Sequence, residues 1–324
     1  MLLSLAGGWL WMDYRAVLEE PVVSGAAKIF EIARGETPAQ IARRMYQDGF
    51  NIRPLWFRLL ARMNGTAARI RYGEYKIAAG TTLPELLALF ASGKVHFHAV
   101  TFVEGWTFRQ ALDALRDNPA IGHTLDGVPP AEIMAALGLP PANPEGRFFP
   151  DTYFFAKGGS DRVILLQAHA RMRAVLEDEW RRRDEADVPA TPEEALILAS
   201  IVEKETALAE ERPRVAGVFM RRLRKGMLLQ TDPTVIYGMG DTFKGDIHSE
   251  DLRRDTPYNT YVHPGLPPTP IALPGRSALN AVLHPARDDS LYFVARGDGG
   301  HVFSATLDEH ARAVNHWQKG NRKQ

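Results

Sequence analysis

A short strand followed by a glycine turn and a capped helix recurs in the first third of the chain. "FEIARGETPAQIARRMYQDG" starts at Phe30 and "YKIAAGTTLPELLALFASGK" at Tyr75, and the two segments align without gaps. A weaker third copy, "VTFVEGWTFRQALDAL", starts at Val100. Each copy has a threonine followed three residues later by Gln or Glu, which is the signature of a helix capping box. The pairs are Thr37 with Gln40, Thr82 with Glu85, and Thr107 with Gln110. The pattern predicts short strands that each lead into a helix. The alternative is that capped strand–helix units are common and the likeness is only local.

The composition is that of a globular protein. The 324 residues are 45% hydrophobic and 24% charged, so the chain can bury a sizeable core, and its length favours two domains. Lys plus Arg and Asp plus Glu both total 39, which leaves no net basic field to attract nucleic acid. The absence of cysteine excludes disulfides, thiolate metal sites and cysteine nucleophiles.

These patterns predict an α+β protein with a small N-terminal module and a larger mixed α/β domain. We expect the module over residues 27–100 and the larger domain over residues 161–324. Residues 101–160 form the expected connecting region, because they include a stretch rich in Pro and Gly with room for one short helix.

The N-terminus is apolar but short. About twelve apolar residues precede Asp13, fewer than the roughly 20 that a membrane-spanning helix needs. No basic segment precedes them, so the start is not a complete signal peptide. Trp9 and Trp11 lie where the apolar stretch becomes polar, as in the aromatic belt of a membrane interface. We interpret residues 1–26 as a partial membrane anchor and linker. The alternative is an amphipathic arm packed on the body of the protein.

A second strong helix signal lies in the middle of the chain, where "LASIVEKETA" occupies residues 198–207. Thr191 is a good N-cap, Pro192 suits the first turn and Glu194 completes a capping box. The helix is therefore predicted from about residue 192 to about residue 210.

Two glutamates end the apolar run of this helix. Glu203 and Glu205 are two residues apart and so point about 200° away from each other on a helix. Glu205 continues the apolar stripe of Leu198, Ile201 and Val202, and a carboxyl in that position has the raised pKa that a general acid needs. Periodicity thus favours Glu205 as an acid and Glu203 as a supporting residue. Alternatively, both pair with the cations that are close in sequence, which are Lys204, Arg212 and Arg214.

Two downstream loops have the composition of a sugar site. "GMLLQTDPTVIYGMG" (226–240) and "TPYNTYVHPGLPPTPIALPG" (256–275) combine hydrogen-bonding side chains with tyrosines, Pro and Gly. A pyranose ring offers hydroxyl groups at its edge and an apolar face for stacking, so both kinds of side chain are useful. The alternative is a pair of surface turns without function.

Other signals are weaker. His96 and His98 share one face of a predicted strand, but no third ligand is evident, so an ordinary sheet is favoured over a metal site. His301 follows a glycine-rich turn and either lines the cleft or caps a hairpin. The basic run that includes Arg222 is interpreted as a solvated helix surface. The alternative is that it lies near anionic lipid headgroups or glycan-strand peptides.

Long segments of the chain resemble those of a known family. They are, in chain order, "PEGRFFPDTY", "LASIVEKET", "RLRKGMLLQTDPTVIYGMG", "PYNTYVHPGLPPTPIALPG", "ALNAVLHPA" and "LYFVARGDGGHVFSATLDEH". They resemble the characteristic segments of the YceG-like, or MltG-type, endolytic murein transglycosylases, from about Phe102 to His310. The N-terminal repeat is similar to the LysM-like region of that family, and the apolar start corresponds to its single membrane anchor, shortened here.

The resemblance implies a lytic transglycosylase. Such an enzyme cleaves the β-1,4 bond between N-acetylmuramic acid (MurNAc) and N-acetylglucosamine (GlcNAc) in nascent peptidoglycan strands. It leaves 1,6-anhydroMurNAc ends and so terminates strand elongation. The resemblance also implies a cytoplasmic-membrane protein with one N-terminal anchor and a periplasmic catalytic domain. Its partners would be glycan strands and peptidoglycan synthases, and no cofactor or metal is expected.

The family's catalytic residue is the second glutamate of its E-K-E-T motif, which matches Glu205. Likeness and chemistry together nominate substrate-cleft residues: Gln230, Thr231, Asp232, Tyr237, Tyr258, Asn259, Tyr261 and, more weakly, Glu145. A hydrolase would need a second carboxylate, Asp232 or Glu145, whereas a lyase can use one acid. The remaining rival is a glycan-binding or scaffold protein without catalysis.

Overall fold

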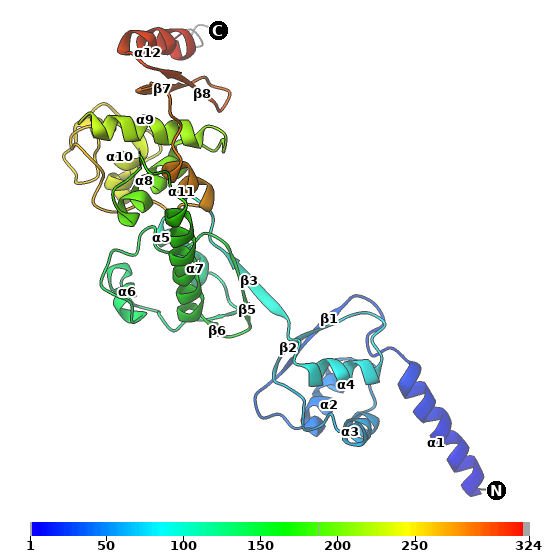
Figure 1. The fold of residues 1–324 in the computed structure, drawn as a ribbon. Coiled ribbons are helices and arrows are strands. Elements are labelled where there is room, and N and C mark those ends of the chain that lie inside the picture. Colours follow the sequence, from blue (N-terminus) through cyan, green and yellow to red (C-terminus); the bar gives the residue numbers. More distant parts are fainter. Residues whose placement is uncertain (1, 187, 320–324) are drawn as a thin grey trace. The chain divides into compact units, whose positions relative to one another are not determined.

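The computed structural model describes residues 2–186 and 188–319 (Figure 1). The chain divides into two compact units. Unit 1 is Met1–Ala99 with Phe154–Gly159, and unit 2 is Val100–Tyr153 with Ser160–Gln324. Two paired strands, β3 (Phe97–Thr101) and β5 (Thr152–Ala156), carry the chain from one unit to the other and back.

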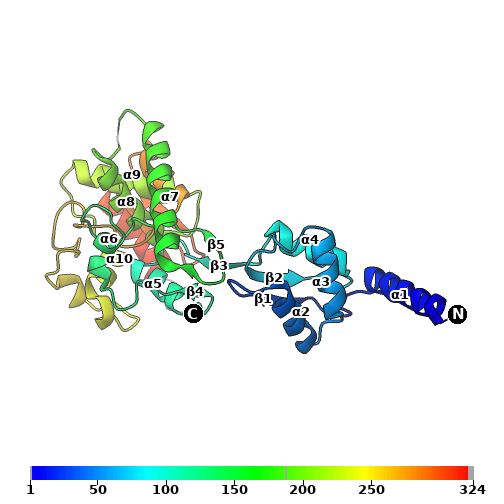
Figure 2. The ribbon, with the colours of Figure 1, turned by 90° about the horizontal axis from the view of Figure 1, so that it is seen from below.

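Unit 1 is built from a two-stranded sheet and helices. In chain order it contains α1 (Leu2–Glu19), β1 (Lys28–Ile32), α2 (Pro38–Gln47), α3 (Pro54–Met63), β2 (Gly73–Ile77) and α4 (Leu83–Ser92). The strands β1 and β2 are antiparallel, and Phe30 pairs directly with Tyr75. The two segments that start the sequence repeat are therefore neighbours in the sheet. Their aromatic side chains are buried in one apolar core together with residues of α2, α3 and α4. Figure 2 shows these helices beside the two strands.

The predicted helix starts in this region are confirmed. Capping boxes are formed at Thr37, Thr82 and Thr107, and each threonine precedes the first residue of a helix. The third of these helices, α5 (Phe108–Arg116), belongs to unit 2. The repeat thus describes local structure correctly, although its third copy lies outside the unit that the other two share.

The helix α1 packs on unit 1 through its second half. Val17 is buried in the core of the unit, and the indole Nε1 of Trp56 donates a hydrogen bond to Asp13 at 2.5 Å. Earlier in the helix, Trp9 and Trp11 are 68% and 62% exposed. Met1, the first residue of the predicted anchor, lies outside the described residues. No described helix has the length and apolar character needed to cross a membrane.

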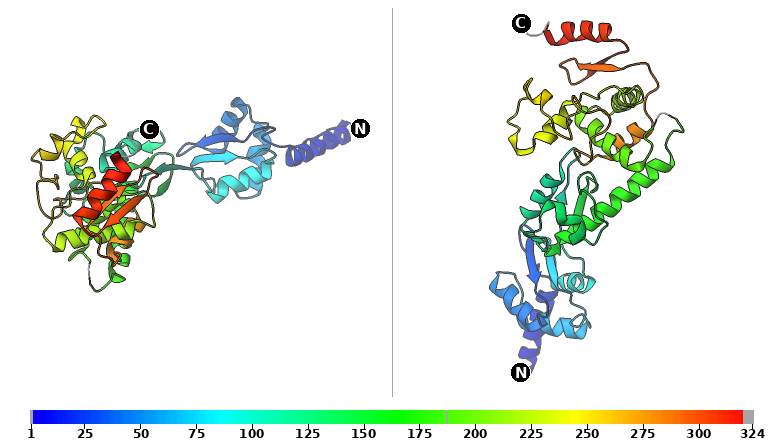
Figure 3. Two further views of the ribbon diagram at one scale, coloured as in Figure 1. Left: turned by 90° about the horizontal axis from the view of Figure 1, so that it is seen from above. Right: turned by 90° about the vertical axis from the view of Figure 1, so that its left-hand side faces the viewer.

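Unit 2 is mainly helical. Its first half contains α5, β4 (Ile121–Gly122), the 3-10 turn η1 (Pro130–Glu132), α6 (Ile133–Ala136) and α7 (Asp161–Arg181). The short strand β6 (Gly159–Ser160), at the boundary between the two units, pairs with β4. Its second half contains α8 (Pro192–Glu205), α9 (Arg212–Arg224), α10 (Asp232–Met239), η2 (Gly240–Thr242), η3 (Asp251–Arg253) and α11 (Arg276–Leu283). The chain then forms β7 (Tyr292–Ala295), β8 (His301–Ser304), α12 (Leu307–Val314) and η4 (Asn315–Lys319). The strands β7 and β8 form an antiparallel hairpin, and α12 packs against it (Figure 3).

The helix α8 is the centre of unit 2. It contacts α7, α9, α10 and α11, and its residues from Ala195 to Val202 are all buried. Thr191 caps its start as predicted, because its hydroxyl accepts a hydrogen bond from the Glu194 amide. The Glu194 carboxylate accepts from the amide of Ala190 and not from that of Thr191, so the predicted capping box is only half formed. The predicted end near residue 210 is wrong. The helix stops at Glu205, because Thr206 adopts an extended conformation with φ −143° and ψ 133°.

Candidate active site

A cavity of about 470 Å³ opens in unit 2 beside Glu205, the last residue of α8. Its walls come from the end of α8, from α9, from the segment that leads into α10, from the β7–β8 hairpin and from α12. Of the residues that the sequence nominated, it is lined by Glu205, Gln230, Asp232 and Tyr261.

The environment of Glu205 suits an acid–base catalyst. Removal of the carboxyl from solvent raises the pKa of Glu205 to about 7, and the negative charge of Asp232 acts in the same direction. The negative end of the α8 dipole also disfavours the charged form. A hydrogen bond from the Thr231 hydroxyl and electrostatic interactions with His301 and Arg222 oppose the shift. Near neutral pH the carboxyl can therefore both give and take a proton.

An unusual backbone conformation aims the Thr231 side chain at Glu205. Among the described residues other than glycine, only Gln230 has a positive φ, at 53°. Its amide donates to the carbonyl of Thr260 at 3.1 Å, and the amide of Thr231 donates to the Thr260 hydroxyl, also at 3.1 Å. Thr260 is buried and was not nominated from the sequence. It holds the strained turn, so that Thr231 and Asp232 are presented together at the entrance to α10.

A second carboxylate faces the same cavity. The Tyr261 hydroxyl donates to Asp232 Oδ1 at 2.6 Å, and both side chains line the cavity. Burial raises the pKa of Tyr261, so its phenol stays protonated and remains a donor. Tyr261 thus holds the Asp232 carboxylate in a fixed orientation.

Arg222 is a cavity residue that the sequence had led us to expect on a solvated helix surface. It is 8% exposed and lines the cavity, so it does not lie on a solvated helix surface. Its guanidinium donates to the carbonyls of Leu291 at 2.7 Å and Leu229 at 2.8 Å. Within the described part of the chain it forms no salt bridge, so its charge is held in place by neutral oxygens. Helical spacing alone could not reveal this, since the accepting carbonyls come from the loops that follow.

His301 also lines the cavity, which answers the question that the sequence left open. Its ring Nδ1 lies 2.7 Å from Glu211 Oε2, and its backbone amide donates to Glu211 Oε1 at 2.9 Å. This bidentate contact fixes the first residue of β8 and leaves Nε2 as the ring nitrogen that Glu211 does not engage. The glycine-rich turn before His301 was the one sequence signal for its position.

The remaining nominated residues do not line the cavity. Tyr237 donates to Glu145 Oε2 at 3.1 Å and packs edge-on against Tyr258, with ring centroids 4.8 Å apart. Glu145 is 4% exposed and also accepts from the Phe108 amide, and burial raises its pKa to about 7. Asn259 donates to three carbonyls of the preceding turn, those of Asp251, Leu252 and Arg254. These four side chains support the loops around the site.

The two glutamates at the end of α8 have different surroundings. Glu203 forms a buried salt bridge with Arg212, with Oε1 and Nη2 2.7 Å apart, and accepts from the Gly275 amide at 2.9 Å. Glu205 forms no salt bridge with a described lysine or arginine. The alternative in which both glutamates pair with cations therefore holds only for Glu203.

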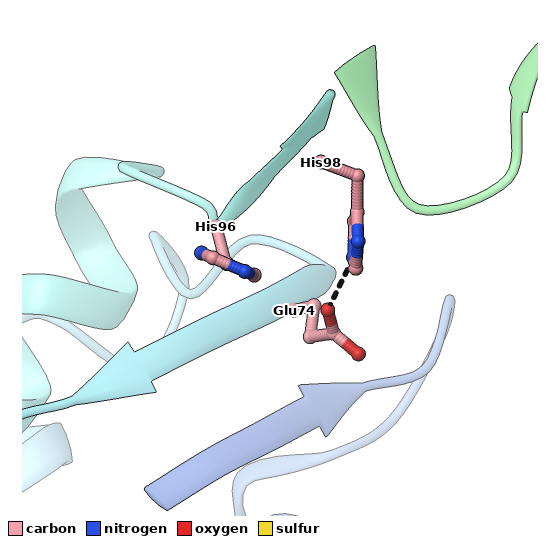
Figure 4. Close-up of side chains that lie close together, drawn as sticks. All are labelled: Glu74, His96 and His98. Carbon is pink, nitrogen blue, oxygen red and sulfur yellow. Dashed lines mark hydrogen bonds and ion pairs between the residues drawn. The ribbon is translucent and has the colours of Figure 1, made fainter. Parts of the chain in front are cut away.

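Among the described residues, the group of side chains with the geometry to hold a metal ion lies in unit 1 and not at this cavity. Glu74 joins His96 and His98 there (Figure 4). No third ligand was evident in the sequence, because Glu74 is more than 20 residues from the two histidines, but the structure brings its side chain beside them.

Comparisons with known proteins agree on one family. The model of the YceG-like family matches residues 30–316. An endolytic murein transglycosylase of Bacillus subtilis is 30% identical over 264 residues, which cover 76% of this chain and 73% of that protein. An endolytic murein transglycosylase of Streptococcus pneumoniae is 34% identical over 175 residues, or 52% of this chain. That match spans only 31% of the Streptococcus protein. The crystal structure of a yceG-like protein from Listeria monocytogenes has a TM-score of 0.56 and 27% identity. The match covers 88% of this chain and 98% of that one.

Proposed function

The chain belongs to the YceG-like family, and from this premise we propose that it is an endolytic murein lytic transglycosylase with Glu205 as catalytic acid and base. The observation that carries the proposal is a single carboxyl with a pKa of about 7 in the wall of a 470 Å³ cavity. A cavity of this size suits part of a glycan strand.

The reaction needs no other acid. Glu205 protonates the oxygen that links MurNAc C1 to GlcNAc, and the C1–O bond breaks. The carboxylate then takes the proton from the C6 hydroxyl of the same MurNAc, whose oxygen attacks C1. The products are a 1,6-anhydroMurNAc end and a free GlcNAc hydroxyl, no water is consumed, and Glu205 is again protonated.

Asp232 stabilises the reaction electrostatically in this proposal. The bond breaks through a state with positive charge at C1, and an ionised carboxylate in the same cavity lowers the energy of that state. Its charge also helps to keep Glu205 protonated before the reaction. Because Asp232 lines the cavity, a hydrolase that uses it to activate water is the second candidate function.

Arg222 and His301 line the same cavity, and in this proposal they contact an anionic substrate. Peptidoglycan carries carboxylates on its stem peptides, and a fixed guanidinium in the cavity can pair with one of them. We assign this role to Arg222, whose guanidinium forms its described hydrogen bonds with carbonyl oxygens and lies over the ring of Tyr292, 5.1 Å from the ring centroid. His301, oriented by Glu211, presents its Nε2 to a sugar hydroxyl or N-acetyl group.

The other parts of the chain fit the same role. We propose that unit 1 is a LysM-like module that binds the glycan strand, a reading supported by the pairing of its two repeat segments in one sheet. The exposed Trp9 and Trp11 of α1 support an N-terminal attachment to the cytoplasmic membrane, with the catalytic unit outside the cytoplasm. Peptidoglycan synthases are the proposed protein partners.

Analysis of the new glycan ends tests the proposal. Uncrosslinked strands are incubated with the wild type or Glu205→Gln, and the ends are identified by mass spectrometry. Anhydro ends from the wild type alone are expected. Reducing ends would establish the hydrolase instead. If neither kind of end forms, the non-catalytic glycan-binding function would replace both.

A further inference from the structure

Three side chains with metal-binding atoms meet in unit 1, whereas the candidate catalytic cavity belongs to unit 2. Glu74 lies on β2, His98 on β3 and His96 immediately before β3. The backbone amide of His96 donates to the carbonyl of Glu74 at 2.5 Å and brings the two segments together. The nearest ligand atoms of the three side chains, one from each, all lie within 4.8 Å of one another (Figure 4).

The ligand chemistry is selective. Two imidazole nitrogens and one carboxylate oxygen form a donor set that suits zinc and similar transition ions, whereas magnesium and calcium prefer oxygen ligands. Zinc–nitrogen bonds of about 2.0–2.1 Å place tetrahedral ligand atoms about 3.4 Å apart. The present ligand atoms lie up to 4.8 Å apart, so metal binding requires the side chains to rotate, and the partial exposure of His96 and His98 leaves them room to do so.

The surroundings leave the necessary atoms available. His98 Nε2 and Glu74 Oε2 are joined by a hydrogen bond of 2.7 Å. A metal ion that displaces the shared proton could be coordinated by the same two atoms. The other oxygen of Glu74, Oε1, accepts from Lys157 Nζ at 3.3 Å, and Lys157 also donates to Glu31 at 2.8 Å. Lys157 thereby orients the Glu74 carboxylate so that Oε2 faces the histidines. Side chains that coordinate metals are commonly oriented in this way by hydrogen bonds to neighbouring residues.

An ion-pair network without a metal would use Glu74, His98 and Lys157. It leaves His96 unexplained, because the His96 imidazole forms no hydrogen bond or ion pair in the described part of the chain, although its ring packs against His98. A metal site uses all three side chains. His96 is therefore the residue that distinguishes the two explanations.

We propose that Glu74, His96 and His98 form a site for one zinc ion, with a fourth position open to solvent or a further ligand. The ion links β2 to β3, the strand along which the chain leaves unit 1. Its role is separate from the chemistry at Glu205. In a chain without cysteine, a site of this kind uses imidazoles where many zinc sites use thiolates.

Metal titration of the full chain tests the site. The protein is stripped with a chelator and titrated with Zn²⁺ by calorimetry and in competition with a chromogenic chelator. We expect one zinc ion per chain, and affinity that is lower by at least about tenfold in His96→Ala, which leaves the contacts of Glu74 with His98 and Lys157 intact. His263→Ala, which removes an exposed histidine that pairs with Asp255, is the matched control and should bind like the wild type.

Cobalt provides a second measurement. Co²⁺ bound to two imidazoles and a carboxylate should give visible absorption bands that are lost in His96→Ala, while the far-ultraviolet circular dichroism of the variant stays unchanged. Absence of saturable zinc binding by the wild type would overturn the proposal, and so would equal affinities of the wild type and His96→Ala. Cleavage of glycan strands by His96→Ala reports separately on the Glu205 site, so failure of one proposal is distinguishable from failure of the other.

Discussion

The Thr231 hydroxyl donates a hydrogen bond to the Glu205 carboxylate, and this contact joins the end of α8 to the start of α10. The two residues are 26 positions apart in the sequence. The contact favours the charged form of Glu205, while burial favours the neutral form more strongly. The balance leaves the pKa near neutrality, where one carboxyl can serve as acid and then as base.

Replacement of Glu205 should abolish catalysis without unfolding the protein. Glu205→Gln keeps the side-chain shape but cannot transfer a proton, so we expect strand cleavage to fall by about 10²–10⁴-fold. Glu210→Gln, at an exposed position five residues later, is the control and should retain full activity. The rate is measured from the new glycan ends. Wild-type activity in Glu205→Gln would contradict the assignment.

The pH dependence of catalysis should change when the hydrogen bond from Thr231 to Glu205 is removed. The reaction starts from protonated Glu205, so kcat/KM should fall as pH rises through about 7. Thr231→Val removes a hydrogen bond that lowers the pKa of Glu205, and the fall should therefore move to higher pH. Profiles of both proteins on soluble glycan strands check this. A shift to lower pH, or none, would show that Thr231 does not tune the carboxyl.

Glu145 should make stability depend on pH. Its pKa is raised from 4.5 to about 7 in the folded state, so between these values the folded protein binds more protons than the unfolded chain. The contribution of Glu145 to stability is therefore fully present below about pH 4.5 and is lost as pH rises through about 7. Glu145→Gln should flatten this dependence of stability on pH, which is measured by urea unfolding. Both proteins carry Glu205→Gln, because the pKa of Glu205 is also raised from 4.5 to about 7 and would add the same dependence. The exposed Glu132→Gln should leave it unchanged.

The buried pair of Glu203 and Arg212 should be sensitive to loss of one partner. Arg212→Met leaves the Glu203 charge buried without its cation, at an expected cost of about 3–5 kcal/mol in the free energy of unfolding. Glu203→Gln combined with Arg212→Met should recover part of this loss. Denaturant unfolding measures both variants, with the exposed Arg253→Met as the control. Equal stability of the single and double variants would mean that Glu203 is not charged.

Arg222→Met should weaken binding of anionic strands. We expect a higher KM than for the wild type, while the control Lys225→Met, at an exposed position of the same helix end, leaves KM unchanged. Strands whose carboxyl groups are capped as amides provide the decisive comparison. The wild type should bind capped strands no better than Arg222→Met does. If capping weakens both proteins equally, Arg222 does not contact a carboxylate.

Local sequence patterns were sufficient for many elements of this fold. The threonine capping signals placed the starts of α2, α4, α5 and α8 correctly, because a capping interaction involves only a few neighbouring residues. The stripe that ends at Glu205 and the E-K-E-T motif identified the same glutamate, which does line the cavity. The end of α8 was missed, because no glycine or proline marks it before Pro213 and the stop is made by the extended Thr206.

The sequence by itself determined where the helices begin, which family the chain resembles and which glutamate to examine. The tertiary structure decided which side chains share a site. It placed Arg222 and His301 beside Glu205, separated Tyr237 from the cavity and brought Glu74 to His98. The physical reason is distance along the chain. Helix caps and helical faces are determined by residues within one or two turns of the helix. These contacts join positions many residues apart, so they form only when the core of each unit has packed.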